Sequence, residues 1–304
     1  MKKYGLSLLF VFSALFLGCD HNDTSSTPEF TETVPTIKIG LIPEHDIFQQ
    51  LERYRPLADY LNQKCDINIQ MKALTQYGNI VANFQELKLD AAFLGSFTYA
   101  LCQSVLGLEV VGRPEAEDGT STYYGMIFVR KDSNISNAHD MKGKTFVFVD
   151  KATTAGYLLP LAYFKKNGIR DYKTYFRTTY FSGTHEDAIN DVLNGLADIG
   201  AAKNTVYFRL EKKDQRIKNE LVVLEKSPEV PENALAFRKE IDDGIKHRMK
   251  VELLDMHNHP DGRKALAQLG ARKFIETSDE DYESVYHYAE TIGLDLAHYD
   301  YMNE

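Results

Sequence analysis

Strand-like and helix-like patterns alternate along this chain, and this alternation restricts its fold more than any other feature. Residues 36–42 alternate between apolar and polar, which predicts a strand, and residues 46–62 carry apolar side chains at helical spacing. A second strand is predicted at 67–71, a second helix at 77–86 and a buried strand at 89–94. Strands that alternate with helices predict a parallel sheet with helices on both faces.

The same succession starts again near residue 124. The strands predicted in this second part are 124–130, 144–149, 175–181, 198–202 and 221–224, and its predicted helices are 158–166 and 186–196. The remainder is mainly helical by its pattern, at 239–256, 262–269 and 279–292.

The restart predicts two lobes, because a folded part of about 270 residues is too long for one small core. We expect an α/β fold with parallel-rich sheets, helices on both sheet faces, and a hinge made of two chain crossings. Lobe 1 would contain residues 35–124 and 226–304, and lobe 2 residues 128–222.

The first 18 residues have the pattern of a secretory leader, with Lys2 and Lys3 before an apolar run that is too short to span a bilayer. The run ends in Leu17-Gly18-Cys19, which looks like a bacterial lipobox whose cysteine is acylated. A cleaved signal with an incidental cysteine is the alternative. We expect a signal peptide at 1–18, a lipid on Cys19, and a polar, flexible tether at 19–34, which together would anchor the protein on the periplasmic or extracytoplasmic face of a membrane.

Charge and cysteine content narrow the possible partners. The chain has 35 basic and 44 acidic residues, and loss of Lys2 and Lys3 with the leader would change its net charge from −9 to −11. This acidity disfavours nucleic acid as a partner. Cys65 and Cys102 are expected to be buried as small apolar residues, although export leaves a disulfide between them possible.

Segment 150–160 joins a predicted strand to a predicted helix and suits an anion. Thr153 or Thr154 is placed to cap the helix, and Ala155 and Gly156 are small enough for a ligand to approach the backbone. The first amides of a helix lack partners within it and attract negative charge. An ordinary capped helix without a ligand is the alternative.

Segment 93–99 repeats this arrangement in the first predicted lobe. Gly95 permits a tight turn after Leu94, and Ser96 is predicted to cap the following helix, so that its hydroxyl and the free amides could hold further oxygens of the same ligand. Both segments follow the carboxyl ends of strands, where open α/β sheets bind ligands. His185, at the start of a third helix, could donate to an oxyanion, and a surface histidine beside a cap is an equal alternative.

Taken in order, segments 91–96, 150–160, 182–188 and 200–205 resemble the phosphate-, phosphite- and phosphonate-binding proteins of ABC importers, over roughly residues 37–269. The resemblance implies a periplasmic-binding-protein fold, type II-like, that closes around a ligand between its lobes. It implies an ABC permease as partner and a monomeric binding protein with no cofactor, metal or catalytic residue.

The resemblance also implies roles for individual residues. Thr153, Thr154 and Ala155 match the loop that binds phosphonate, where Ala155 replaces a frequent serine and can offer only its amide. His185 matches the ligand histidine. The other candidate ligand residues are Leu94, Gly95 and Ser96 in the first-lobe turn, Pro43 and Glu44 in the first strand–helix turn, Tyr123 before the hinge strand, and Asn204 in the last matching segment.

Two departures from the family pattern bear on the ligand. Val206 and Asn233 stand where relatives that bind aminoalkylphosphonates place acids. A buried ligand ammonium would lack its charge partners there, which is unfavourable. We therefore expect phosphate, phosphite or a small alkylphosphonate, and the sequence does not rank these three.

The sequence is compatible with three other functions: a sensory module of the same fold, an extracytoplasmic phosphate-ester hydrolase, and a binding protein for another small solute. His257, His259 and Asp261 could be metal ligands, but a loop at a helix end is the simpler interpretation. Ser182, His185 and Asp187 are close in sequence, which does not establish the geometry of a nucleophilic triad.

Overall fold

The computed structural model describes residues 34–78 and 80–303. The predicted signal peptide, Cys19 and all of the predicted tether except Val34 lie outside the described residues. The strands of the described part form two mixed sheets and one two-stranded ribbon.

The first sheet has six strands in the order β13-β4-β12-β3-β1-β2. Their bounds are β1 (Thr36–Leu41), β2 (Asn68–Ala73), β3 (Ala91–Leu94), β4 (Glu109–Glu115), β12 (Ala234–Phe237) and β13 (Lys273–Glu276). Strand β1 pairs in parallel with β2 and β3, whereas β12 pairs antiparallel with β3 and β4, and β13 with β4. The parallel strands β1, β2 and β3 therefore end at one edge of the sheet.

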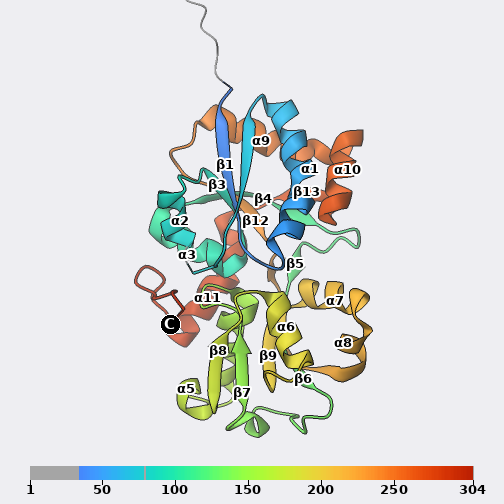
Figure 1. Cartoon of the computed structure of the whole chain (residues 1–304). Helices are drawn as coiled ribbons and strands as arrows, with labels where there is room; N and C mark the ends of the chain where they lie inside the picture. Colours follow the sequence, from blue (N-terminus) through green and yellow to red (C-terminus); the bar gives the residue numbers. More distant parts are fainter. Residues whose placement is uncertain (1–33, 79, 304) are drawn as a thin grey trace, which may run out of the picture. The chain divides into compact units, whose positions relative to one another are not determined.

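The two faces of this sheet are covered by different helices (Figure 1). Helices α1 (Ile47–Cys65), α9 (Asp243–Asp255) and α10 (Pro260–Leu269) share one apolar cluster with Phe93. Helices α2 (Ile80–Glu86) and α3 (Ser96–Leu106) share another with Leu94. Successive strand residues point to opposite faces, so Phe93 and Leu94 contribute to the two different clusters.

The second sheet has five strands in the order β10-β6-β9-β7-β8. Their bounds are β6 (Gly125–Arg130), β7 (Thr145–Phe148), β8 (Thr178–Phe181), β9 (Ile199–Lys203) and β10 (Leu221–Lys226). Strand β7 is parallel to β8 and β9, and β6 is antiparallel to β9 and β10. The connecting elements are η1 (His139–Met141), the π-helix η2 (Thr154–Leu158), α4 (Leu159–Lys166), α5 (Tyr172–Tyr175), α6 (His185–Leu193), α7 (Asn204–Lys213) and α8 (Gln215–Glu220).

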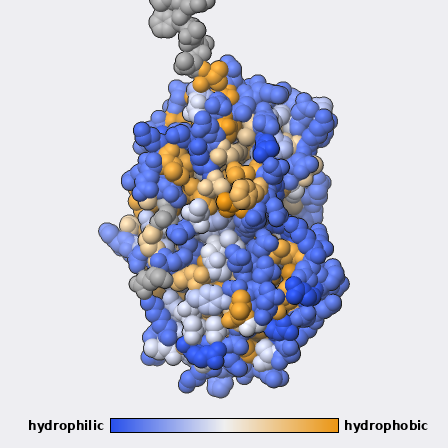
Figure 2. All heavy atoms as spheres, in the orientation of Figure 1, coloured by the Kyte–Doolittle hydropathy of each residue, from blue (hydrophilic) through white to orange (hydrophobic). Residues whose placement is uncertain are grey.

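The chain passes between the two sheets twice. Strands β5 (Thr122–Tyr123) and β11 (Val230–Pro231) lie on these two crossings and pair antiparallel with each other. One apolar cluster includes residues from both sheets, among them Leu94 of β3 and Val147 of β7. The C-terminal part adds η3 (Met256–Asn258), η4 (Asp279–Tyr282) and α11 (Glu283–Ile292), which contacts both α3 and α4. On the face shown in Figure 2 hydrophilic residues predominate, and apolar residues form separate patches.

Most predicted elements are present with small shifts at their ends, and both sheets are mixed because each contains antiparallel pairs. Three antiparallel strands of the first sheet, β4, β12 and β13, were not predicted from the sequence. Strand β12 is the four-residue segment Ala-Leu-Ala-Phe, buried throughout, so it shows no polar alternation. Strand β4 contains Gly112 and Pro114, both of which argue against a strand. Strand β13 has only two apolar residues between Lys273 and Glu276. Helices α7 and α8 were missed as well.

The two cysteines of the described residues are free and buried, as expected. Cys65 ends α1 and Cys102 lies within α3, and both pack in apolar clusters. Burial raises the pKa of both thiols, to about 11 for Cys65.

Gly156 lies where the π-helix packs against the end of β7. A Cβ atom added there would lie 2.4 Å from Val149 Cβ and 2.7 Å from Thr153 Oγ1. The absence of a side chain therefore allows η2 to approach the preceding strand. This is a different role from the ligand access expected from the sequence.

We predict that Gly156→Ala lowers the free energy of unfolding by about 1–3 kcal/mol, since the added methyl group overpacks this contact. Denaturant-induced unfolding measures the change. Leu196→Ala, at a side chain that is 68% exposed, is the control and should change stability by less than about 0.5 kcal/mol. Equal stability of the Gly156→Ala variant and the wild type would contradict the close contact.

Candidate anion-binding site

The two helix starts singled out in the sequence meet in the structure. The Phe97 amide of α3 donates to Thr154 Oγ1 of η2 at 2.8 Å, and Thr98 Oγ1 donates to the Ala152 carbonyl at 2.9 Å. Both hydrogen bonds are buried. Strand β3 ends just before α3, and β7 ends shortly before η2, so these contacts join the carboxyl ends of parallel strands from both sheets.

The hydroxyls at these starts do not cap the helices as predicted. Gly95, not Ser96, occupies the N-cap position of α3, and Ser96 Oγ instead donates to the Pro231 carbonyl at 2.6 Å. Thr153 occupies the N-cap position of η2, but its hydroxyl donates to the Asp150 carbonyl at 2.6 Å. Neither turn is capped by the side chain of its own N-cap residue, so its first amides need acceptors from elsewhere, and the Phe97 amide finds one in Thr154 Oγ1.

His185 is a buried residue rather than a surface one, with 4% of its surface exposed. It is the first residue of α6, after the N-cap Thr184. The Lys203 amide donates to His185 Nδ1 at 3.2 Å, so a neutral ring carries its proton on Nε2. Burial lowers the pKa of His185 to about 3, which makes the ring a neutral donor near pH 7.

Tyr77 belongs to the site and was missed in the sequence. It lies between β2 and α2, its hydroxyl is buried without a hydrogen-bond partner, and its ring packs edge-on against His185 with 6.1 Å between the centroids. Burial raises the pKa of Tyr77 well above its usual value, so the hydroxyl keeps its proton. A buried donor without an acceptor is unfavourable by about 1–3 kcal/mol, and a ligand oxygen would supply one.

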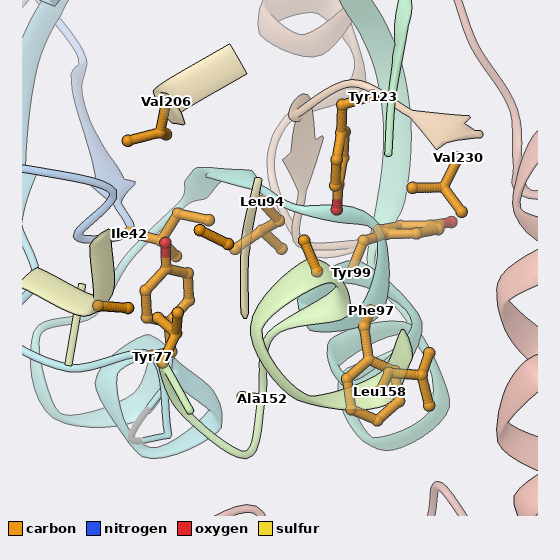
Figure 3. Close-up of a cluster of buried hydrophobic side chains, with 14 of the residues drawn as sticks. Ile42, Tyr77, Leu94, Phe97, Tyr99, Tyr123, Ala152, Leu158, Val206 and Val230 are labelled. Carbon is orange, nitrogen blue, oxygen red and sulfur yellow. The ribbon is translucent and has the colours of Figure 1, made fainter. Parts of the chain in front are cut away.

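Tyr123 approaches the same place from the first crossing. Figure 3 shows the Tyr77 and Tyr123 hydroxyls directed from two sides toward the region of Leu94. The Tyr123 hydroxyl is 3.7 Å from the position that a Cβ of Gly95 would take. It lies close enough to Ser96 and Thr154 for their hydroxyls to act on its pKa, which burial raises. The structure thus gathers Leu94, Gly95, Ser96, Thr154, Tyr123 and His185 around one spot together with Tyr77.

Glu44 and Pro43 lie in the turn between β1 and α1 and are both buried. Glu44 Oε1 accepts from Lys203 Nζ at 2.8 Å, so the carboxylate already has a cationic partner. Burial alone would raise the pKa of Glu44, but the Lys203 ammonium and the Arg209 guanidinium together outweigh burial and hold the pKa well below its usual value. Glu44 is therefore an ion-pair partner within the protein.

Two other predicted residues contact the first chain crossing. Asn204 Oδ1 accepts from the Tyr124 amide at 3.0 Å. Ala155 packs against Gly125, where an added Cβ would lie 3.1 Å from Ala155 Cα. Their described contacts hold η2 and α7 against β6.

The metal and triad alternatives gain no support from the described residues. His259 Nε2 contacts Asp255, His257 Nδ1 contacts the Leu254 carbonyl, and residues 34–78 and 80–303 contain no group of three or more potential metal ligands. Ser182 Oγ donates to the Phe148 and Thr184 carbonyls and makes no hydrogen bond with His185. In the same described ranges no helix is long and apolar enough to cross a membrane.

A family model of the periplasmic substrate-binding proteins of phosphonate ABC transporters matches residues 39–282. The chain belongs to this family. The resemblance found in the sequence and the expected two-lobed periplasmic-binding-protein fold are thereby confirmed.

Relatives in the family are distant in sequence. The chain is 24% identical over 253 residues to the phosphonates-binding periplasmic protein of Escherichia coli K12, covering 82% of this chain and 74% of that protein. It is 21% identical over 306 residues to the "Probable ABC transporter phosphite binding protein PhnD1" of Prochlorococcus marinus MIT 9301, covering 96% of this chain and 98% of that protein.

Solved structures share the fold. A binding-protein component of an ABC phosphonate transporter from Pseudomonas aeruginosa aligns with a TM-score of 0.79 at 23% identity, over 86% of this chain and 87% of that one. The PhnD1 structure from Prochlorococcus marinus, in complex with methylphosphonate, aligns with a TM-score of 0.75 at 18% identity, over 84% and 98%.

We predict that His185 makes the folded protein sensitive to acid. The unfolded histidine takes up a proton near its ordinary pKa of 6.5, whereas the folded one does so only near 3, so stability is full above pH 6.5 and falls as the pH drops toward 3. The loss approaches about 1.4 kcal/mol per pH unit within this window. The groups acting on the ring are Tyr77, Glu44, Lys203 and Arg209.

Urea unfolding of the wild type and of His185→Gln at several pH values between 7 and 4 measures this effect. Burial raises the pKa of Asp150 to about 6, which acts in the opposite direction, but this contribution is common to both proteins and cancels in the comparison. Parallel stability curves for the two proteins would contradict a buried neutral His185.

Proposed function

We propose that this substrate-binding protein captures phosphate, phosphite or a small alkylphosphonate and delivers it to a membrane permease. One observation carries the proposal: the Phe97 amide and the Thr154 hydroxyl meet across the two sheets, and Tyr77, in the same apolar cluster as Phe97, has a buried hydroxyl without a partner. The ligands named for the relatives, phosphonates, phosphite and methylphosphonate, support the same class of oxyanion.

The charge of the ligand must be compensated locally, because the chain is acidic overall. Amides, hydroxyls and the neutral His185 ring would donate charge-assisted hydrogen bonds to the oxyanion. In this proposal the ligand replaces Thr154 as the acceptor of the Phe97 amide and also accepts a hydrogen bond from the Thr154 hydroxyl. A ligand held by donors from both sheets binds the closed arrangement more tightly than an open one, and this difference in affinity favours closure.

We propose that the protein binds its ligand without converting it. A hydrolase of this site would need a base to activate a nucleophile. His185 Nδ1 already accepts the Lys203 amide, and the neutral ring holds its proton on Nε2. The site therefore offers donors to an oxyanion and lacks an available imidazole base.

We further propose the lobe boundaries 35–124 with 226–304 and 128–222, with the hinge at the two crossings. The pairing of β5 with β11 supports this division, since both crossings run side by side there. The protein would act as a monomer, anchored through a lipid on Cys19 at the periplasmic or extracytoplasmic face of the membrane, where it would meet its permease.

A ligand panel tests the proposed function. We expect phosphate, phosphite or methylphosphonate to raise the melting temperature of the purified soluble chain, since a ligand that binds only the native state stabilises it. Sulfate is the matched control anion. The absence of both a thermal shift and calorimetric heat with all three phosphorus oxyanions would overturn the proposal.

We predict that Thr154→Ala weakens binding of the ligand found in that panel by about 10- to 100-fold, the range for one hydrogen bond to a charged group. Thr154→Pro should weaken it further, because it also removes an amide. Titration calorimetry measures both, with the exposed Thr178→Ala as control. Unchanged affinity in both Thr154 variants would contradict a role of residues 153–155 in ligand binding.

The lipid anchor has a separate test. In a bacterial host that acylates lipoproteins, the full chain should fractionate with membranes and partition into detergent, and Cys19→Ser should release it to the aqueous phase. Recovery of the unmodified wild type in the aqueous phase would contradict the anchor.

A further inference from the structure

A lysine ammonium is buried beside the candidate anion site. Lys203, the last residue of β9, is 3% exposed. Its Nζ donates to Glu44 Oε1 at 2.8 Å, to Asn233 Oδ1 at 3.0 Å and to Glu232. It also lies 4.3 Å from the centroid of the Tyr123 ring. Two carboxylates, an amide oxygen and an aromatic face thus surround one ammonium, which is the environment that a free amine would require.

This cluster adjoins the spot where the oxyanion would bind. Asn233 Oδ1 lies 3.3 Å from the position that a Cβ of Gly95 would take, and the Tyr123 ring reaches from the lysine to Gly95. The Lys203 backbone amide holds His185 through Nδ1. The ammonium contacts Asn233, which in turn lies against Gly95, so one side chain separates the lysine from the turn that holds the oxyanion donors.

Beyond the lysine lies a cavity of about 140 Å³ that Lys203, Glu44, Glu232 and Asn233 help to line. Arg209 also lines it, and its Nη2 is buried without a hydrogen-bond partner. The lysine side chain thus stands between the oxyanion donors and additional space.

We propose that Lys203 is the specificity-determining residue of this site: its ammonium fills the two-carboxylate pocket in which the amine of an aminoalkylphosphonate would otherwise bind. This inference rests on the proposed function. It assigns the rejection of amine-bearing ligands to a cation already in place, in addition to the absence of acids at positions 206 and 233.

The balance of charge explains why the site would reject a ligand that carries an amine. In the native protein the charge of Lys203 offsets the charges of Glu44 and Glu232. Burial alone would lower the pKa of Lys203, but the two carboxylates outweigh this effect of burial and raise the pKa above its usual value, so the buried lysine stays charged. A ligand ammonium entering the cluster would meet a like charge in a desolvated place. Removal of the lysine side chain would leave Glu44 and Glu232 without the ammonium that contacts them, with the Arg209 guanidinium acting on them only through space. An amine two carbons from phosphorus would restore the missing contacts.

Lys203→Ala tests the inference with two ligands of the same size. In this variant we expect 2-aminoethylphosphonate to bind at least about tenfold more tightly than propylphosphonate, a preference within the range for one hydrogen bond to a charged group. The wild type should show no such preference. Lys203→Met refills the volume with an apolar chain and should not acquire the preference for the amine. Adding Glu44→Gln and Glu232→Gln to Lys203→Ala should abolish the preference, because the two carboxylates are then neutral. Titration calorimetry gives each dissociation constant.

The outcomes separate this inference from the proposed function. Failure of wild-type protein to bind phosphate, phosphite and methylphosphonate overturns the function itself. The wild type could instead bind one of these three oxyanions while Lys203→Ala binds 2-aminoethylphosphonate and propylphosphonate with equal affinity. That result overturns only the role of Lys203 in specificity and leaves Lys203 as a member of a structural ion pair. Lys203→Ser, which retains a polar group for Glu44, gives the same comparison if the alanine variant does not fold.

Discussion

The contact between the starts of α3 and η2 determines what the rest of this protein can do. Phe97 donates its amide to Thr154 across the two sheets, and Thr98 donates to the Ala152 carbonyl beside it. Each of these helix starts follows the end of a parallel strand, so the sheets orient the donors, and the shared apolar cluster around Leu94 and Val147 holds the sheets together behind them. A periplasmic binding protein needs this arrangement because its ligand must be held from both sides at once.

Electrostatic balance around this contact relies on separate neutral and charged layers. The groups nearest to the contact are neutral donors: two tyrosine hydroxyls whose pKa values burial raises, and a histidine ring whose pKa burial lowers. The charged layer lies one side chain away, where Lys203 is paired with Glu44 and Glu232. A buried cation with two buried anions is tolerated because each group has direct partners, whereas loss of one member leaves an unpaired charge.

The mixed sheets explain how the chain returns to its first sheet. After β10 the chain passes through β11 and enters the first sheet as β12, antiparallel between β3 and β4. This insertion brings Asn233, which precedes β12, next to Gly95 after the end of β3, while the adjacent Glu232 contacts Lys203. The segment from β11 to β12 therefore contributes both to the proposed hinge and to the charged layer of the candidate site.

The sequence by itself determined the alternation of strands and helices, the family, and the two glycine- and hydroxyl-rich junctions, because these depend on local periodicity and on residues adjacent in the chain. It also identified His185, Tyr123 and Glu44 as candidates. Only the tertiary structure decided what the residues of these segments do. The hydroxyls of Ser96 and Thr153 donate to backbone carbonyls and do not cap helices, and Gly156 allows η2 to pack closely against Val149. Glu44 forms an ion pair with Lys203, a lysine 159 positions away. Tyr77 and Lys203 were not identified as site residues, although Lys203 lies in the matching segment 200–205, because only long-range packing brings their polar ends to one place.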